Sequence, residues 1–499
     1  MVAVVVVGIF VWTWADEPKP APSSDFPPFF KFCPKPSNMP SSASLHVQRR
    51  KKRPTACPKG VLRKYSLLIL CSVWMFSNES SVGLTVSADS TSPRIFQRRR
   101  VQIVHRHGDR SPITPLNDET YWEEQLIPSS TMDRISSNTA LVEDETCHSR
   151  HIANGRGPFG KLTELGLLQM IKLGSKLREM LVEPLENEDV PQPDTENRLV
   201  LPYLFDERNN RLDPSKLRIL STNMDRTIQS VRGTLVGLFP DGTDTTIPID
   251  VRNTDWMIPD PNPRRSTEQA PLELRLSQRS HILDKEKQLR SLAETATQAL
   301  QDLLAEDAVE MSFGTPQPSD NKVDISSDYE YTTTPLLSWN QLAEICGCLA
   351  VRDRLPLSPD DHATIRLHTA WRAFQAYSDP RLAQLAMGTL ASALLATTYD
   401  EDGRPLPPLT IWSAHDSTLI GLLCAFRLEQ PVEWPEYGSF FMVELLQEVG
   451  IGGSEESWMV RFSLNGEVLR TFWNDAPTDM IALDELRQKM AAPATSAFQ

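Results

Sequence analysis

The sequence predicts an α/β fold, because three short apolar runs each lead through a loop with ionisable residues into a helical pattern. These runs are typical of strands and cover residues 100–104, 217–220 and 409–412. A chain of 499 residues, of which 40% are hydrophobic, can bury a large core and form more than one lobe. Ligands of open α/β sheets bind at the edge where strands end, so the three loops are the first candidate site.

The first run, RVQIV, passes directly into the segment HRHGDRSP. Gly108 permits a tight turn, and Pro112 prevents further strand pairing. We therefore expect Arg106, His107 and Arg110 in a loop at the end of a strand. This cluster is either a solvated loop or a site that holds an anion.

The second run, LRIL, is followed by Ser221, Thr222 and Asn223, whose side-chain oxygens predict a helix N-cap. Arg226 then falls in the first helical turn. Its charge is unfavourable there because the helix dipole is already positive, and a bound anion would compensate it. Without an anion, Arg226 is an ordinary surface side chain. The predicted helix places four apolar residues on one face: Ile228, Val231, Leu235 and Leu238.

The third run, LTIW, follows two prolines and leads to His415 and Asp416. Ser417 and Thr418 are predicted to cap the next helix. Alone, the His-Asp pair is typical of a capped turn. Together with the other two junctions, it indicates one site at one sheet edge. The helix has an apolar pattern of four residues: Leu419, Leu422, Leu423 and Phe426.

Charge is distributed unevenly along the chain. The full sequence has 51 Lys and Arg against 65 Asp and Glu, a formal net charge of −14. Residues 1–100 hold 15 of these bases and 5 of the acids, so the remainder is strongly acidic. The acidic part lacks the basic footprint that binds phosphate backbones, so we expect no nucleic-acid partner. Any anion must be bound by a local group of cations.

The seven cysteines are too sparse for a disulfide framework, because only four lie beyond residue 100. Cys346 and Cys348 lack the spacing and the partner pair of a zinc site, so we expect them to pack in a helix. The sequence leaves the redox compartment open.

Residues 1–92 are predicted to form a basic, Pro/Ser-rich extension outside the folded domain of residues 93–499. Apolar runs open the chain and recur at residues 66–76; the second is too short for a membrane span but matches the apolar part of a signal peptide. Two interpretations stay open. The extension is disordered sequence, with a start codon that is itself in question, or it is a signal or membrane anchor. The second interpretation favours a secretory or membrane-anchored location over a mitochondrial one.

Three motifs together resemble a known family: RHGDRSP, STNMDRT and SAHDSTL, in this order. They are similar to those of the histidine acid phosphatases, the RHG-x-R-x-P branch of the histidine phosphatase superfamily. The segment KLTELGLLQMIKLG also resembles a helix of these enzymes, and the resemblance covers about residues 96–475. It implies a central mixed sheet flanked by helices, with an inserted, mostly helical lobe. The implied core is about 96–115, 161–263 and 385–475, and the implied lobe is about 116–160 and 264–384.

The resemblance and the chemistry of phosphoryl transfer imply the same roles. His107 would attack phosphorus and form a phosphohistidine. Asp416 would protonate the leaving group, which requires its protonated form and favours acidic pH. Guanidinium groups match phosphate oxygens, so no metal or other cofactor is expected. The implied phosphate ligands are Arg106, Arg110, Arg226 and His415.

The substrate is expected to be an anionic phosphomonoester. Segments such as STNMDRTIQSVRGTLVGLF and EWPEYGSFFMVELLQE are most similar to the lysophosphatidic acid phosphatase type 6 subgroup. A phosphorylated sugar or an inositol phosphate stays an alternative substrate. Two other classes of protein, a non-catalytic phosphate-binding relative and a phosphomutase, also stay open.

Several residues have no assigned role in the predicted site. Asp109 is expected only to moderate the arginine cluster, and residues 314–335 are predicted to form a flexible polar loop. A helix is predicted within residues 337–357. His105 has no further ligand at metal-binding spacing. Six histidines are expected at the surface or in packing: His46, His148, His151, His281, His362 and His368.

Overall fold

The computed structural model describes nine stretches of the chain: residues 96–143, 156–181, 204–206, 211–253, 257–261, 266–305, 336–400, 403–448 and 457–492. The predicted extension of residues 1–92, the loop of residues 314–335, and three of the histidines (His46, His148 and His151) lie outside these stretches. Membrane association through the extension therefore stays a prediction. Among the described helices, none is long and apolar enough to cross a membrane.

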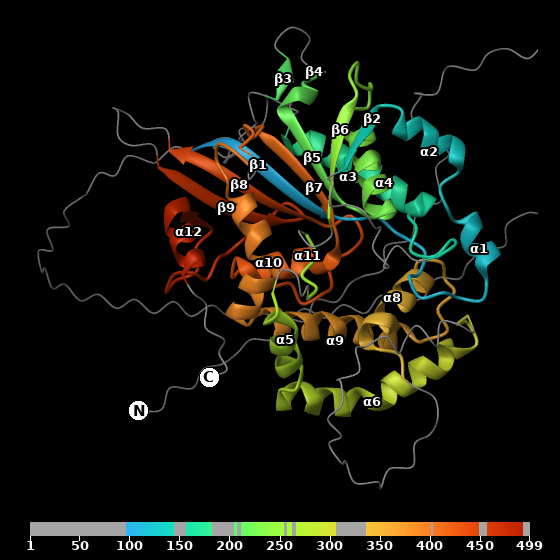
Figure 1. Cartoon of the computed structure of the whole chain (residues 1–499). Helices are drawn as coiled ribbons and strands as arrows, with labels where there is room; N and C mark the ends of the chain where they lie inside the picture. Colours follow the sequence, from blue (N-terminus) through green and yellow to red (C-terminus); the bar gives the residue numbers. More distant parts are fainter. Residues whose placement is uncertain are drawn as a thin grey trace, which may run out of the picture. The chain divides into compact units, whose positions relative to one another are not determined.

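A mixed sheet of nine strands forms the centre of the described structure (Figure 1). The strand order is β10-β9-β8-β1-β7-β5-β6-β2, and β11 pairs with β9. The strands from β1 to β2 in this order are parallel, and β8 joins β1 in antiparallel orientation. The bounds are β1 Phe96–Arg106, β2 Thr139–Glu143, β5 Leu217–Thr222, β6 Ile247–Arg252, β7 Leu409–Ala414, β8 Phe440–Glu448, β9 Trp458–Leu464, β10 Glu467–Leu469 and β11 Met480–Ala482. A separate pair consists of β3 Phe205–Asp206 and β4 Arg211–Leu212.

The three predicted strands are neighbours in this sheet, in the order β1, β7 and β5. All three run parallel, so their carboxyl ends meet at one edge. The predicted α/β fold class is confirmed, but each strand ends two residues later than predicted, and β1 also begins four residues earlier. β1 continues through Arg106, because His105 and Arg106 still pair with β7. Arg106 is thus the last residue of a strand and not part of a loop.

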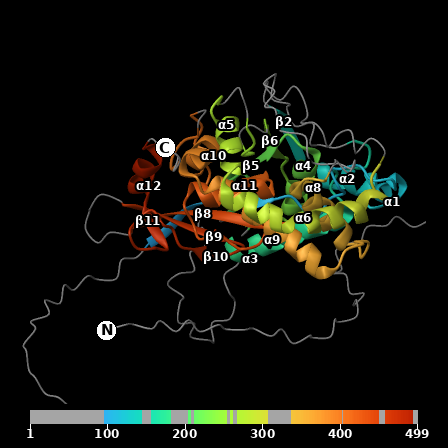
Figure 2. The same cartoon turned by 90° about the horizontal axis from the view of Figure 1, so that it is seen from below.

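Helices cover both faces of the sheet. On one face, α3 (Glu164–Leu181) and α4 (Asp225–Leu238) pack against Val101 and Ile103. On the other face, α10 (Pro380–Leu394) and α11 (Asp416–Ala425) pack against Val104 and Trp412, with α12 (Leu483–Ala491) beside them. Figure 2 shows α3 and α10 on opposite sides of β8 and β9. The predicted apolar faces of α4 and α11 are all buried. Because successive side chains of a strand point to opposite faces, the sheet separates two hydrophobic cores.

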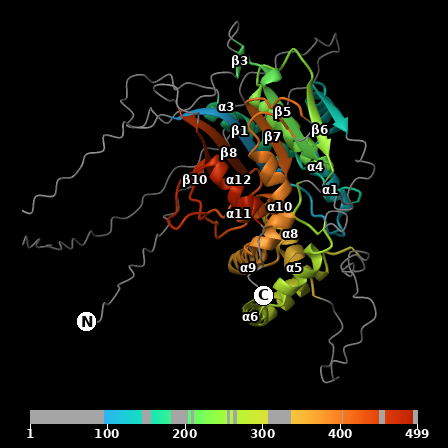
Figure 3. The same ribbon diagram turned by 60° about the vertical axis from the view of Figure 1, so that its left-hand side comes forward.

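A third core lies among helices beyond the end of the sheet (Figures 1 and 3). It joins α6, α8 and α9 with Trp122 of α1, and α8 confirms the predicted helix within residues 337–357. Ser338 caps α8 through a capping box with Gln341. The bounds of the remaining helices are α1 Glu119–Glu124, α2 Ser129–Ser136, the 3-10 turn η3 Pro214–Lys216, α5 Gln269–Ser277, α6 Ser280–Gln301, α8 Trp339–Ala350 and α9 Pro359–Tyr377.

Two elements that pack with the sheet include residues predicted to belong to the helical lobe. Thr139–Glu143 forms β2, which pairs in parallel with β6 at the edge of the central sheet. Pro380 begins α10, which packs on the sheet with α11. The division into a sheet core and an inserted lobe itself stays a prediction.

Candidate active site

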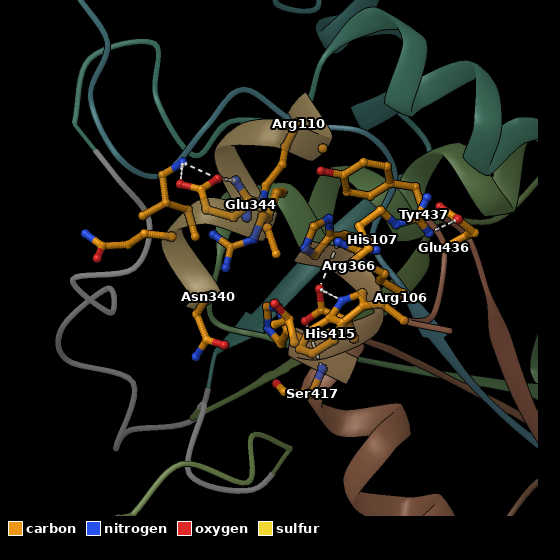
Figure 4. A pocket seen from close by; sticks show the side chains of 18 of the residues that line it. Arg106, His107, Arg110, Asn340, Glu344, Arg366, His415, Ser417, Glu436 and Tyr437 are labelled. Atoms are coloured by element: carbon orange, nitrogen blue, oxygen red, sulfur yellow. Dashed lines mark hydrogen bonds and ion pairs between the residues drawn. The ribbon is translucent and has the colours of Figure 1, made fainter. Parts of the chain in front are cut away.

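A cavity of about 650 Å³ opens where β1, β5 and β7 end. One wall is α8, and another is the segment that leads into β8, with Trp434, Glu436 and Tyr437 (Figure 4). All six residues predicted to act at the site line this cavity: Arg106, His107, Arg110, Arg226, His415 and Asp416. The three junctions, separated by more than a hundred residues each, therefore form one site.

His107 is held in one orientation by the turn that follows it. Its ring Nδ1 lies 2.8 Å from the carbonyl oxygen of Gly108. The Nδ1–H donates to that carbonyl, which leaves Nε2 with the lone pair. Burial, together with the charges of Arg226 and Arg106, lowers the pKa of His107 well below its usual value. The neutral imidazole is therefore the form of His107 in this site.

The turn at Gly108 is fixed by close packing on α3. A Cβ atom on Gly108 would lie 2.3 Å from the carbonyl oxygen of Gly166. No side chain fits at that distance, so the backbone of the motif rests directly on the first turn of α3. The residue after His107 is therefore in direct backbone contact with α3.

Arg106 spans the cavity floor beneath Tyr437. Its Nη1 donates to the carbonyl oxygen of Pro435 at 2.5 Å, and its Nη2 lies 2.8 Å from Oδ2 of Asp416. The guanidinium carbon lies 4.1 Å from the centre of the Tyr437 ring. Nε has no hydrogen-bond partner among the described residues. Arg106 is therefore oriented on three sides by the protein.

Arg110 and Arg226 add two further buried cations. Arg110 Nη1 lies 3.0 Å from Glu344 Oε2, and although burial opposes the charge, Glu344 raises the pKa of Arg110. Arg226 is only 4% exposed, so it is not the surface side chain of the alternative interpretation. Burial and the nearby Arg110 lower the pKa of Arg226 to about 9. Two cations this close without bulk water favour an anion between them.

The predicted caps of α4 are wrong. The N-cap is Met224, and no side chain caps the helix there. Ser221 and Thr222 still belong to β5, so their hydroxyls bond elsewhere. Thr222 Oγ1 lies 3.0 Å from Nε2 of His415, and this contact connects the second junction to the third.

His415 occupies the N-cap position of α11, and its ring is T-shaped to that of His107 at 5.6 Å between centroids. The prediction that Thr418 caps α11 holds in part: Thr418 is not the N-cap, but its hydroxyl accepts from the backbone N–H of His415, the N-cap residue, at 3.3 Å. Ser417 does not cap; its own N–H donates to Oδ1 of Asp416 at 2.8 Å. Burial and the charge of Arg226 lower the pKa of His415 well below its usual value.

Asp416 is the first residue of α11, and its carboxylate is strongly stabilised. Oδ2 accepts from Trp434 Nε1 at 2.9 Å and pairs with Arg106. Burial alone would raise the pKa of Asp416, but Arg106 and the Trp434 N–H together lower it to about 2. Asp416 is thus ionised at mildly acidic pH, whereas the predicted role as a general acid needs a proton on this group.

Several cavity residues escaped the sequence analysis. Glu344 and Tyr437 contact the arginines, while Arg366 of α9 pairs with Glu436 at the mouth. His362 also lines the cavity. No local pattern marks these residues, because they lie in segments remote from the three motifs.

Two other expectations have clear outcomes. Asp109 does not moderate the arginine cluster; it is fully buried and pairs with Arg352 at 2.6 Å, beside a hydroxyl donor from Thr163. His368 packs as expected, 4.4 Å from the ring centre of Trp339. In the stretches that the structure describes, no group of three or more His, Cys, Asp or Glu side chains could hold a metal ion.

Comparisons with known proteins show which proteins this chain is similar to. Lysophosphatidic acid phosphatase type 6 of Bos taurus is 24% identical over 400 residues, which cover 76% of this chain and 81% of that protein. Counting factor 60 of Dictyostelium discoideum is 23% identical over 387 residues, 74% of this chain and 80% of that one. The solved Hafnia alvei phytase in complex with myo-inositol hexakis sulphate is 12% identical with a TM-score of 0.49, covering 81% of this chain and 98% of that chain.

The family model of the histidine phosphatase superfamily (branch 2) matches residues 99–465, which include all three motifs. The chain therefore belongs to branch 2 of the histidine phosphatase superfamily, and it is a histidine acid phosphatase that hydrolyses phosphomonoesters.

Proposed function

We propose that this phosphatase acts through a phosphohistidine on His107 and that its substrate is a lysophosphatidate-like monoester. The observation that carries the proposal is the neutral His107 ring, with the lone pair on Nε2, among three buried arginines. Arg106, Arg110 and Arg226 would bind the oxygens of the phosphoryl group. Nε2 would then attack phosphorus opposite the ester oxygen.

His415 contributes as a hydrogen-bond donor to the same phosphoryl group. Its Nε2 is already bonded to Thr222 Oγ1, so Nδ1 is the nitrogen left for the phosphate. The neutral ring can donate from Nδ1 if Nε2 accepts from the Thr222 hydroxyl, so no imidazolium is needed. The lowered pKa of His415, caused mainly by burial and by the charge of Arg226, is compatible with this role.

The proton for the leaving group would arrive with the substrate. Asp416 holds a proton poorly, because its pKa is about 2. A phosphate monoester has a second pKa of about 6, so below that pH it carries a proton of its own. When the phosphoryl group takes over the guanidinium of Arg106, Asp416 loses its main ion pair and becomes a better base. The substrate proton would pass to Asp416 and from there to the ester oxygen.

The second step reverses these roles. The departing alcohol takes the proton and leaves Asp416 as a carboxylate. Water then attacks the phosphorus of the phosphohistidine, and Asp416 accepts the proton that water releases. The P–N bond breaks, Nε2 of His107 regains its lone pair, and inorganic phosphate is released.

The cavity beyond the arginines favours an apolar alcohol. Its outer wall includes one side of α8 and residues on the loops that follow β5 and β6. Glu436 already neutralises Arg366 at the mouth, and Asp260 adds a further acid, so additional phosphate groups would find little positive charge. The relationship to the Bos taurus enzyme supports the same class of substrate. The apolar lining residues are Ile113, Met224, Ile258, Ala343, Ala350 and Val351.

A substrate panel at acidic pH tests this proposal. We expect a higher kcat/KM for lysophosphatidate than for glycerol 3-phosphate, which has the same phosphate without the acyl chain. Inositol hexakisphosphate should be the poorest substrate. Preference for inositol hexakisphosphate or a sugar phosphate would refute the proposed substrate and leave the reaction intact.

A variant of the apolar wall sharpens the test. Val351 lines the cavity and is 47% exposed, and Val351→Asp should lower kcat/KM for lysophosphatidate about tenfold while that for glycerol 3-phosphate changes little. Val468 of β10 is 46% exposed but lies outside the cavity lining, so Val468→Asp is the matched control. Equal effects of the two variants would show that Val351, which directly follows α8, does not contact the acyl chain.

A further inference from the structure

Glu344, in the middle of α8, connects this helix to the motif loop. Its Oε1 accepts from the backbone N–H groups of Thr114 at 2.8 Å and Ile113 at 3.0 Å. Its Oε2 accepts from Nη1 of Arg110 at 3.0 Å. The side chain is 15% exposed, and Figure 4 shows it facing Arg110. One carboxylate therefore holds both an arginine and the chain that follows it.

Only a carboxylate can make this arrangement. Its two oxygens serve donors on two sides, whereas the amide of Gln offers one oxygen and one donor group. A Gln at this position would satisfy either the loop or Arg110 and oppose the other. Asp is one methylene shorter than Glu and would not reach both sides from the same helix position. The contacts thus depend on the identity of residue 344.

Glu344 leaves one edge of Arg110 for a ligand. Nη1 is occupied by Glu344 and by the carbonyl oxygen of Ser111 at 3.0 Å. Nε is buried without a hydrogen-bond partner among the residues that the structure describes. The guanidinium is therefore anchored through one nitrogen, and its opposite edge is available for phosphate oxygens.

The negative charge of Glu344 is compatible with an anion nearby. Three N–H donors already share its two oxygens, and one of them carries the full charge of Arg110. The attraction within a buried ion pair can compensate the cost of removing both charges from water when the remaining lone pairs also accept hydrogen bonds. Arg106 and Arg226 still supply positive charge to the cavity.

We propose that Glu344 is a positioning residue for phosphoryl transfer, which fixes the Arg110 guanidinium and residues 113–114 against α8. This inference rests on the proposed role of Arg110 as a phosphate ligand. It also means that α8 contributes twice, with an apolar face toward the alcohol and with Glu344 toward the phosphate site. A shift of α8 would then displace Arg110 as well as the acyl-chain wall.

Glu344→Gln is the main test, because it keeps the size of the side chain and one of the two acceptors. We expect the inhibition constant of inorganic phosphate to rise about tenfold, and kcat/KM for p-nitrophenyl phosphate to fall by a similar factor. The melting temperature should change little. Glu268→Gln is the matched control, because Glu268 also binds an arginine, Arg381, through both oxygens but lies outside the cavity lining.

A double-mutant cycle with Arg110→Ala shows whether Glu344 acts through Arg110. If it does, Glu344→Gln should have little further effect on phosphate inhibition once Arg110 is absent. Full additivity in the double variant would overturn the inference, as would a normal inhibition constant in Glu344→Gln while Arg110→Ala is impaired. Normal kinetics in Arg110→Ala itself would refute the proposed phosphate cradle, and the inference with it.

Discussion

Replacement of Asp416 by Asn separates proton transfer from the structural role of this residue at the start of α11. Asn keeps the shape of the side chain and one oxygen for the Ser417 N–H. It removes the negative charge that pairs with Arg106 and the acceptor of the Trp434 N–H. It also cannot carry a proton between substrate, leaving group and water.

The size of the expected loss of activity follows from which groups of the site carry a proton at the pH of the assay. At pH 5, protonation of a carboxyl with a pKa of about 2 costs about 4 kcal/mol, at 1.36 kcal/mol for each pH unit. In the site without substrate, Asp416 is therefore almost never protonated at pH 5 and cannot supply the proton itself. A substrate monoanion, in contrast, carries a proton into the site. An alkoxide leaving group needs that proton, so we expect Asp416→Asn to lose about 10²–10⁴ in kcat/KM on glycerol 3-phosphate. This ratio reports the steps up to release of the alcohol and excludes the later attack of water, which is common to both substrates. The p-nitrophenolate group is a weak base, so its loss should stay below about tenfold.

Kinetics of both substrates with purified wild-type and variant enzyme provide the assay. Wild-type activity on the alkyl phosphate should also fall as pH rises through about 6, where the substrate loses its proton. Circular dichroism would check that the variant is folded. Equal losses on the two substrates would refute the reasoning, because Asp416 would then only position Arg106.

The pKa of Asp416 also predicts the stability of the fold. Because the folded pKa is lower than the usual 3.8, the carboxylate stabilises the fold above pH 3.8 by about 2 kcal/mol, and this contribution is lost as pH falls toward 2; Asp416→Asn should lack this part of the acid dependence in thermal melts. His107→Ala should abolish turnover and retain the fold, and acid-labile labelling of this variant by radioactive substrate phosphate would contradict the phosphohistidine assignment. Arg226→Ala should raise the inhibition constant of phosphate about 10- to 100-fold, because a charge-assisted contact of about 1.5–3 kcal/mol is lost. Its melting temperature should not fall, since burial already disfavours this cation and lowers its pKa to about 9; normal phosphate inhibition would exclude Arg226 from the cradle.

The site residues that lie within short continuous motifs can be predicted from the sequence. The RHGDRSP, STNMDRT and SAHDSTL segments each follow a strand, and the parallel arrangement of those strands brings them together. Strand ends were less predictable. Thr is a residue type that often caps helices. The backbone of Thr222 nevertheless continues β5, because sheet pairing takes precedence over the local side-chain preference.

The remaining part of the site depends on packing between distant segments. Glu344 lies 234 residues after Arg110, and Trp434 lies in a segment with no regular pattern of its own. Neither has a neighbour in sequence that reveals its partner. The low pKa of Asp416 was missed for the same reason, since Arg106 and Trp434 approach it only in the folded chain.

The central position of β1 has a consequence for synthesis of the protein. β1 pairs with β7 and β8, whose residues are translated more than 300 positions later. At about 5–20 residues per second, β1 would wait roughly 15–60 s at the ribosome before either neighbour exists. Its apolar residues Val101, Ile103 and Val104, which are buried in the folded chain, would lack their sheet partners during that time, and this favours aggregation of the nascent chain. Polypeptides released before residue 409 would lack both partners of β1, and they would aggregate instead of giving a smaller active enzyme.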